Sequence, residues 1–164
     1  LHVLPQLLDV LSRMGVGVML SLAGNERLSE TFENVFQADF LPGDLACRRA
    51  DFVISNGGSP TGYQALRAGK PLIGIASNMD QLLFMQGVEQ LGAGISVRSD
   101  ICRSVDIERA VSKVIASRRF VSRAQLAARE IQELDEQQIF PQFVRQMLNH
   151  EGDYGRKCHL QSMR

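Results

Sequence analysis

The sequence predicts an α/β domain, a Rossmann-like parallel sheet with helices on both faces. Two observations support this prediction. Short apolar runs of strand length alternate along the chain with longer runs that repeat apolar residues every three or four positions. A glycine turn, Asn56-Gly57-Gly58, joins one of these strands to one of these helices. Parallel strands need crossover helices, and such helices cover both faces of the sheet.

The first third of the chain carries recognisable start and stop signals. Four leucines over residues 4–11 recur at helical spacing, and Gly15 is placed to end that helix. Asp44 is a natural N-cap for a further turn of helix. Between these two helices the pattern predicts a strand over 16–22, a short helix over 26–32 and a strand over 35–40.

The central segment predicts an anion site. Residues 51–55 form a short apolar run typical of a buried strand. The glycines at 57 and 58 permit a tight turn, after which Ser59 can cap a helix with Pro60 at its first position. The free N–H groups and the helix dipole then point at one spot, which a phosphate or diphosphate would occupy. For the turn alone, a plain strand-to-helix connection remains an alternative.

The second half continues the alternation. Gly92 ends a helix that lies between two strands, and Ser104 or Asp106 caps the next helix. Phe140, Phe143 and Met147 lie on an apolar stripe of the last helix. The expected elements are a helix over 60–68, strands over 72–76 and 95–97, and helices over 79–91, 104–115, 123–134 and 139–148.

Residues 51–81 resemble the donor-binding signature of GT-B nucleotide-sugar glycosyltransferases, the group that includes the UDP-glycosyltransferases and macrolide glycosyltransferases. In that signature a His-x-Gly turn is followed by Ser or Thr, then Glu, then Gly-x-Pro, then an acidic residue and Gln. The matching positions here are Asn56, Gly58, Thr61, Gln64, Gly69, Pro71, Asp80 and Gln81. The resemblance, looser from about residue 4 to residue 149, implies one half of a GT-B fold.

The resemblance also implies roles for individual residues. Asn56 replaces the family His and Gln64 replaces the family Glu, so both positions keep hydrogen bonding without a charge. Judged without the resemblance, Gln64 could be solvated and Asp80 could simply stabilise a helix start. The implied contacts are the donor diphosphate for Asn56, Gly57, Gly58, Ser59 and Thr61, the ribose for Gln64, and sugar hydroxyls for Asp80 and Gln81.

The implied reaction is transfer of a sugar from a nucleoside diphosphate to an acceptor, with inversion and without a metal or other cofactor. The acceptor, a small molecule or a lipid, and the general base would belong to an amino-terminal domain, so no catalytic residue is assigned. This hexosyltransferase fragment is expected to be inactive alone. Two alternatives share the donor site: a donor-binding subunit of a two-chain transferase, and a GT-B-shaped nucleotide-sugar hydrolase or epimerase.

The domain prediction is a donor-binding domain over residues 1–150, amino-terminally truncated because the first helix lacks a preceding strand, and a disordered tail over 151–164. The stripe on the last helix is expected to face a missing amino-terminal domain or a partner chain. Asp80-Gln81 lies after a strand end, where ligands of open α/β sheets bind.

Composition excludes several other classes of protein. The 164 residues carry no formal net charge and only 6% aromatic residues, which disfavours nucleic acid as a partner. Cys47, Cys102 and Cys158 form no CxxC pair, which favours a reducing compartment and hence the cytoplasm. No apolar run is long enough to span a bilayer. The three histidines lie outside any metal-ligand spacing.

Overall fold

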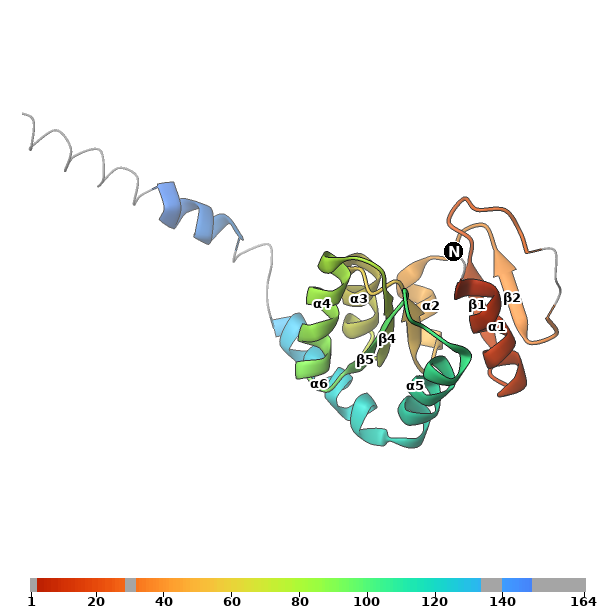
Figure 1. Cartoon of the computed structure of the whole chain (residues 1–164). Coiled ribbons are helices and arrows are strands. Elements are labelled where there is room, and N and C mark those ends of the chain that lie inside the picture. Colours follow the sequence, from red (N-terminus) through yellow and green to blue (C-terminus); the bar gives the residue numbers. More distant parts are fainter. Residues whose placement is uncertain (1–2, 29–31, 134–139, 149–164) are drawn as a thin grey trace, which may run out of the picture. The chain divides into compact units, whose positions relative to one another are not determined.

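The computed structural model describes residues 3–28, 32–133 and 140–148 (Figure 1). The chain divides into two units, Leu1–Arg129 and Glu130–Arg164. The prediction of an α/β fold is confirmed. In chain order the elements are α1 Val3–Arg13, β1 Val18–Ser21, β2 Val35–Ala38, α2 Gly43–Arg49, β3 Val53–Ser55, α3 Ser59–Arg67, β4 Leu72–Ala76, α4 Met79–Gln90, β5 Gly94–Arg98, α5 Ser104–Ala116 and α6 Arg118–Glu133.

The strands of the first unit form two parallel sheets. β1 pairs with β2, with Val18 opposite Val35. β4 lies between β3 and β5, with Leu72 opposite both Val53 and Gly94. The sequence predicted one sheet. The structure has two, of two and three strands, because β1 and β3 are not hydrogen-bonded to each other.

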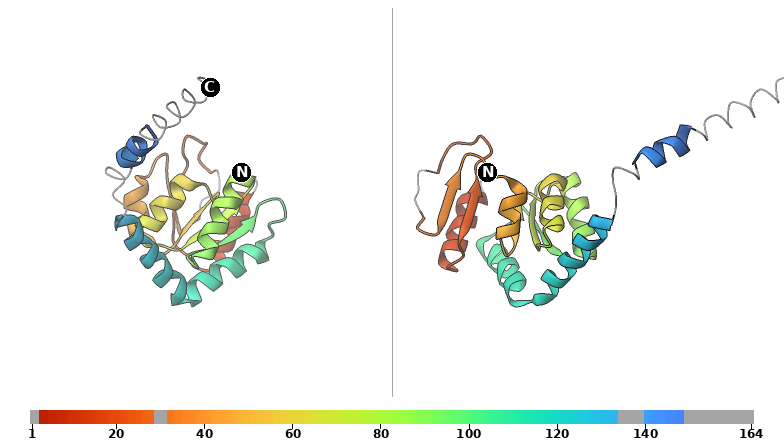
Figure 2. Two further views of the ribbon diagram at one scale, coloured as in Figure 1. Left: turned by 90° about the vertical axis from the view of Figure 1, so that its left-hand side faces the viewer. Right: turned by 180° about the vertical axis from the view of Figure 1, so that it is seen from behind.

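Helices cover both faces of the three-stranded sheet (Figure 2). On one face α1 and α5 pack together over β4, and their buried side chains form the main core. On the other face α4 contacts β4 and β5, and α3 contacts α2 and β3. The main core consists of Val10, Leu11, Ile73, Ile107, Ala110, Val111 and Val114.

The helix predicted over 26–32 is wrong for the residues that the structure describes. Glu26 to Leu28 are not helical. The Leu28 N–H donates to Gln37 Oε1 at 3.2 Å, and Arg27 pairs with Asp39 at 3.3 Å, so the segment is tied to β2 and its end. A helix of one or two turns cannot offset its nucleation cost against such contacts.

Two predicted helix caps are also wrong. The N-cap of α2 is Pro42, and Asp44 lies inside the first turn. The N-cap of α5 is Arg103, and the Asp106 carboxylate accepts a hydrogen bond from the Arg103 N–H at 3.1 Å. An acid in a first turn gains the same dipole stabilisation as a cap, so sequence alone left these positions ambiguous.

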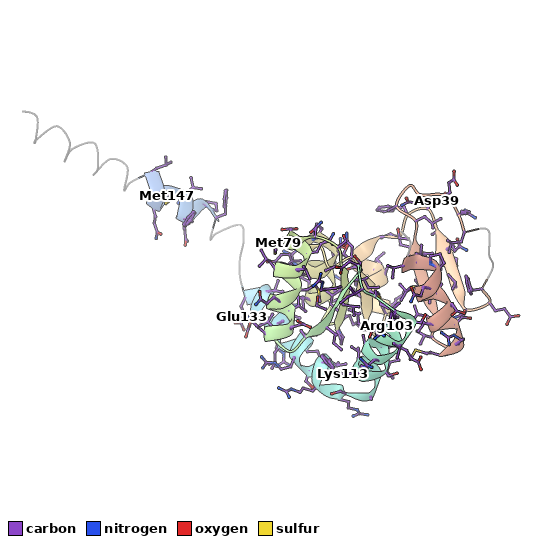
Figure 3. All side chains as sticks on the ribbon, in the orientation of Figure 1. Asp39, Met79, Arg103, Lys113, Glu133 and Met147 are labelled. Carbon is purple, nitrogen blue, oxygen red and sulfur yellow. The ribbon has the colours of Figure 1, made fainter. Side chains whose placement is uncertain are left out.

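The described residues of the second unit are 130–133, at the end of α6, and a helical segment over residues 140–148. Its apolar side chains are exposed, and Met147 projects from it (Figure 3). The tail predicted over 151–164 lies outside the described residues, as do His2, His150, Cys158 and His159. No helix among the described residues is long and apolar enough to cross a membrane.

Candidate functional site

The turn after β3 is built by short side chains that bind its backbone. The Gly57 N–H donates to Ser55 Oγ, and the Gly58 N–H donates to Asn56 Oδ1, each at 3.0 Å. Gly57 adopts a φ of +77°, a conformation that costs other residues about 1–2 kcal/mol. Asn56 is exposed, and its amide nitrogen remains available to donate to a ligand.

The turn leads into the amino end of α3 without a side-chain cap. The N-cap is Gly58, so the prediction that Ser59 caps this helix is wrong: Ser59 is its first residue. The helix begins one residue early because the Asn56–Gly58 hydrogen bond closes the turn. Pro60 has no N–H, which leaves the N–H groups of Ser59 and Thr61 at the positive end of the helix dipole.

Helix α4 packs against the turn that joins β3 to α3. Met85 is fully buried beside the two glycines at 57 and 74. A Cβ at Gly57 would lie 2.8 Å from Met85 Cγ, and a Cβ at Gly74 would collide with the Met85 sulfur. The Met85 side chain therefore occupies the space that these glycines leave, and it fixes how far the turn sits from α4.

A cavity of about 970 Å³ opens beside the turn, and three predicted site residues line it: Asn56, Thr61 and Gln64. Gln64 is half-buried and lies against Gly43 at the start of α2, where a Cβ would collide with the Gln64 side-chain oxygen. The cavity thus brings two of the predicted phosphate residues, Asn56 and Thr61, together with the predicted ribose residue, whereas Gly57, Gly58 and Ser59 are not among its lining residues.

The loop between β4 and α4 holds the other two predicted residues. Gln81 is 8% exposed, and its side-chain oxygen accepts hydrogen bonds from the Ser77 N–H at 2.8 Å and the Ser77 hydroxyl at 3.0 Å. Asp80 is exposed in the first turn of α4. Neither residue is among those that line the 970 Å³ cavity. Gln81 therefore has a structural role that the sequence did not indicate, and only its amide nitrogen is left for a ligand.

Three residues of this region were missed from sequence. Asn78 caps α4 by accepting from the Gln81 N–H at 3.0 Å, and Ser77 holds the Gln81 side chain. The Asn-x-x-Gln spacing of 78 and 81 is that of a capping box and could have indicated the cap. Gly62 is the third: a Cβ there would collide with the Phe84 ring of α4.

Gln81→Met should lower the free energy of unfolding by about 1–2 kcal/mol, because both Ser77 donors lose their acceptor while the volume is kept. Urea unfolding measures the change. Gln90→Met, at the exposed end of the same helix, is the matched control and should stay within about 0.5 kcal/mol of the parent. Equal stability of the Gln81 variant and the parent would mean that the Ser77 contacts contribute nothing to the loop.

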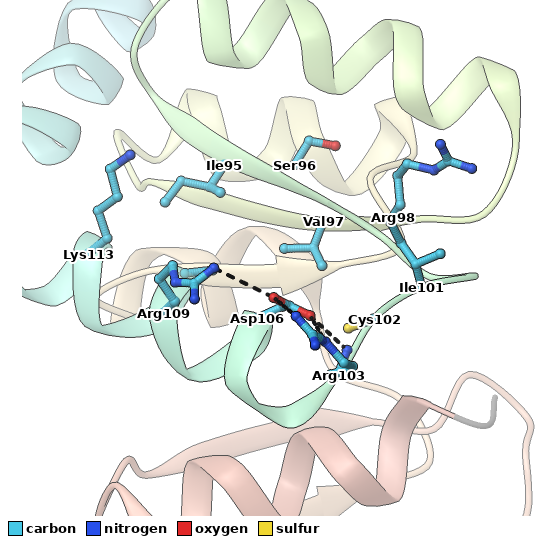
Figure 4. Close-up of a pocket in the computed structure, with 11 residues that line it drawn as sticks. Ile95, Ser96, Val97, Arg98, Ile101, Cys102, Arg103, Asp106, Arg109 and Lys113 are labelled. Carbon is cyan, nitrogen blue, oxygen red and sulfur yellow. Dashed lines mark hydrogen bonds and ion pairs between the residues drawn. The ribbon is translucent and has the colours of Figure 1, made fainter.

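A second cavity, of about 620 Å³, lies between β5 and α5 and contains none of the predicted site residues (Figure 4). Three of its charged groups, Arg103, Asp106 and Arg109, pair with each other. Arg103 lies 3.1 Å and Arg109 lies 3.7 Å from the Asp106 carboxylate. The hydrogen bond from the Arg103 side chain is the main reason that the pKa of Asp106 is below its ordinary value. These arginines are engaged, and the cavity is not a candidate donor site.

The 970 Å³ cavity contains one thiol, Cys47. Burial, and next the nearby Asp44 charge, raise the pKa of this thiol, so it is protonated at neutral pH and supplies no thiolate. Within the described residues no group of three or more His, Cys, Asp or Glu side chains is arranged to hold a metal ion.

Comparison with known proteins identifies the family to which the chain belongs. A family model described as "Erythromycin biosynthesis protein CIII-like, C-terminal domain" matches residues 5–147. The chain belongs to this family. The resemblance to the carboxyl-terminal half of GT-B glycosyltransferases, inferred above from the signature residues, is therefore confirmed.

Curated relatives carry glycosyltransferase names. A PGL/p-HBAD biosynthesis glycosyltransferase of Mycobacterium tuberculosis (strain ATCC 25618 / H37Rv) is 40% identical over 119 residues, which is 73% of this chain and 28% of that protein. A PGL/p-HBAD biosynthesis rhamnosyltransferase of Mycobacterium bovis (strain BCG / Pasteur 1173P2) is 38% identical over 148 residues, 90% of this chain and 32% of that protein. The chain thus spans about a third of the length of these relatives.

Solved structures share the fold. A spinosyn rhamnosyltransferase complexed with spinosyn aglycone superposes with a TM-score of 0.71 at 21% identity, covering 80% of this chain and 37% of that one. The glycotransferase of kitacinnamycin gives a TM-score of 0.73 at 18% identity, covering 81% and 36%. The α/β fold with helices on both faces is accordingly that of one half of macrolide glycosyltransferases.

Proposed function

We propose that the first unit binds the nucleoside diphosphate of a sugar donor, and that it is the donor half of an inverting glycosyltransferase. The observation that carries the proposal is the amino end of α3, which has no side-chain cap and follows the Gly57-Gly58 turn, next to a cavity that Asn56, Thr61 and Gln64 line. The family membership supports it, because the relatives are named glycosyltransferases.

Each residue has a role in this proposal that its geometry allows. The two glycines have no side chain, which lets the diphosphate approach the backbone, while their own N–H groups donate to Ser55 and Asn56. The N–H groups of Ser59 and Thr61, with the Asn56 amide nitrogen, donate to the phosphate oxygens. Gln64 binds the ribose from its place over Gly43. Asp80 accepts from the sugar hydroxyls, and the Gln81 amide nitrogen donates to them.

The chemistry proposed for these groups is stabilisation of a leaving diphosphate. Negative charge grows on the phosphate oxygens as the glycosidic bond breaks, and fixed N–H groups at a helix end lower the energy of that charge without reorganising. The sugar contacts at the β4–α4 loop orient the anomeric carbon for attack from the opposite side. The acceptor and general base belong to the two thirds of the relatives that this chain does not span. Neither a metal nor another cofactor is part of the proposed mechanism.

Titration of the chain with UDP, dTDP and GDP, by calorimetry and by chemical-shift mapping, tests the proposal. A spinosyn rhamnosyltransferase has been solved with thymidine diphosphate, which makes dTDP the first choice. We expect shifts centred on Gly58 and Thr61, with an affinity that EDTA does not change. If no nucleotide perturbs these residues at millimolar concentration, the proposal is wrong.

Asn56→His should tighten diphosphate binding as the pH falls through the imidazole pKa. A protonated imidazole donates a charge-assisted hydrogen bond, which is worth about 1 kcal/mol more than a neutral amide bond. The imidazole is charged below about pH 6.5, so the gain is present at acidic pH and is lost as the pH rises. Calorimetry at pH 5.5 and 8 measures it, with Asn78→His as control. Equal affinity at both pH values would show that position 56 does not touch the phosphates.

A second candidate is a donor-binding subunit that works with a separate partner chain. The exposed apolar side chains of the helical segment favour it: Phe140 and Met147 are 69% and 56% exposed.

The reaction would take place in the cytoplasm, and the free thiols of Cys47 and Cys102 are consistent with that compartment.

In the isolated chain we expect the amides over 140–148 to exchange rapidly with solvent, because the apolar side chains of this segment are exposed. Hydrogen exchange measures this, with light scattering across a concentration series to detect association. Strong protection in a clean monomer would place the stripe in the chain's own core and remove the case for a partner there.

A further inference from the structure

The strand β5 is the edge of the three-stranded sheet, and among the described residues only β4 pairs with it. The Ser99 N–H donates to the Ala76 carbonyl at 2.8 Å, on the β4 side. Backbone groups alternate along a strand, so those of Ser96 and Arg98 point the other way, out of the sheet edge. A row of outward backbone groups of this kind is a template for pairing with another extended chain.

One of these outward groups is already bound to a carboxylate of the same chain. The Ser96 N–H donates to Glu89 Oε1 at 2.8 Å, and Glu89 is an exposed residue in the last turn of α4. Glu89 thus holds the place that a backbone carbonyl of a neighbouring strand would take. The next outward residue, Arg98, pairs its side chain with Asp100 at 2.6 Å. A charged side chain at an open edge blocks casual strand pairing, and a solvent-exposed one is displaced by a partner that offers more hydrogen bonds.

This edge borders the cavity of about 620 Å³, which forms a groove between β5 and α5 (Figure 4). Residues 95–98 of β5 line one side of it, and Ala110 and Lys113 of α5 line the other. Ile95 and Val97 give the groove an apolar floor, since both pack against the main core. A groove between an edge strand and a helix is a shape in which an extended peptide binds as an added strand.

The helix side of this β5–α5 groove carries more positive than negative charge. Arg103 and Arg109 share one carboxylate, that of Asp106, at 3.1 and 3.7 Å. Lys113 lines the same groove and takes part in neither ion pair. Three cations therefore face one acid on this side, which leaves a surplus of two positive charges. The charge calls for a partner with two acidic residues.

We propose that the β5–α5 groove binds an extended peptide segment that has acidic residues at two alternate positions and pairs with β5 as an added strand. Side chains at positions i and i+2 of a strand share a face and lie about 6.6–6.8 Å apart. Arg109 and Lys113 are four residues apart on α5, which is about 6 Å along the helix axis. The two spacings match, so each acid meets one cation. The residue between the two acids then bonds to the backbone of Ser96.

Other occupants fit the groove less well. A second copy of this chain, paired edge to edge through β5, would bring the same positive surplus to the contact, and like charges placed opposite each other destabilise a strand pair. An anionic membrane surface would meet the cations but leave the outward backbone groups of β5 without partners. None of the residues assigned to the nucleotide lines this groove, so the inference stands apart from the proposed function.

The test titrates the full chain with the acetylated and amidated peptide Thr-Val-Glu-Val-Glu-Val-Thr, by calorimetry and chemical-shift mapping. A matched control of the same composition, Thr-Val-Val-Glu-Glu-Val-Thr, sends its two acids to opposite faces of a strand. A second control replaces the central valine by proline, which has no N–H to donate to the Ser96 carbonyl. We expect both controls to bind about tenfold more weakly. At saturation, amide exchange at Arg98 should slow about tenfold, with the inward amides of Ile95 and Val97 as internal references.

Variants of the chain separate the charge from the strand pairing. Lys113→Gln should weaken binding of the first peptide about fivefold, because one acid loses its cation. Arg119→Gln removes the same charge from an exposed site outside the groove and should change the affinity by less than about twofold. Glu89→Ala should strengthen binding about fivefold, because the peptide no longer competes with the Glu89 carboxylate for the Ser96 N–H.

Equal affinity of the two acidic peptides would mean attraction by charge alone and would overturn the proposal, as would unchanged amide exchange at Arg98. Slow exchange at Arg98 without peptide, accompanied by a dimer in light scattering, would overturn it in favour of a second copy. Vesicles of phosphatidylglycerol that perturb Ser96 and Arg98 more than the peptide does would overturn it in favour of a membrane surface. The dTDP titration reads a different set of residues, so failure of either proposal leaves the other testable.

Discussion

Gly57→Ala is expected to lower the free energy of unfolding by about 2–5 kcal/mol and to abolish diphosphate binding. The backbone at Gly57 has a φ of +77°, which costs an alanine about 1–2 kcal/mol. The new Cβ would also lie 2.8 Å from Met85 Cγ, and forcing an extra carbon into a packed interior costs about 1–3 kcal/mol. Relaxation would either rotate the turn or push α4 away, and both movements displace the amino end of α3.

Urea unfolding and dTDP calorimetry on the same samples measure the two effects. Gly87→Ala is the matched control, since Gly87 lies in α4 two residues beyond Met85, with open space around it. That substitution should raise stability by about 1 kcal/mol through helix propensity, without a change in binding. A Gly57 variant as stable as the parent would show that the turn tolerates a side chain, and the close approach proposed for the diphosphate would lose its basis.

The turn over residues 56–58 was predictable because its hydrogen bonds join residues that are close in the sequence. Asn56, Gly57 and Gly58 form their contacts within a few residues, and the sequence indicated both the tight turn and the helix start. The cap was misplaced by one residue, because the Asn56–Gly58 hydrogen bond advances α3 and sequence does not reveal that bond. The strands 72–76 and 95–97 were likewise identified from their apolar runs, to within a residue at each end.

The parts that depend on distant contacts could not be predicted. Gln81 was assigned to the sugar from its place in the signature, but its burial and its hydrogen bonds to Ser77 depend on how α4 meets β4. The separation into two sheets follows from the unpaired edges of β1 and β3, which no local pattern reveals. The prediction of a short helix over 26–32 was wrong for the same reason, because the Leu28 N–H is hydrogen-bonded to Gln37 of β2.

Helices α3 and α4 touch at a glycine, and this contact leads to the second large effect. Gly62 is buried in the first turn of α3, and a Cβ there would collide with two carbons of the Phe84 ring. The ring also makes an edge contact with Tyr63, at 5.4 Å between centroids. Gly62→Ala should therefore cost about 2 kcal/mol, because the ring must leave its position and α3 must shift. Since Thr61 is the adjacent residue, dTDP affinity should fall as well.

The effect of Gly62→Ala on the free energy of unfolding should change sign when the Phe84 ring is absent. In a Phe84→Ala background the space above Gly62 is open, and alanine is then favoured over glycine in a helix by about 1 kcal/mol. A double-mutant cycle, read by urea unfolding, should therefore give a coupling of about 3 kcal/mol between positions 62 and 84. Nucleotide affinity should fall in Gly62→Ala and recover in the double variant, because α3 returns to its place. Equal destabilisation by Gly62→Ala in both backgrounds would show that the ring contact does not set the position of α3, and the donor groups at its amino end would have to be held by β3 alone.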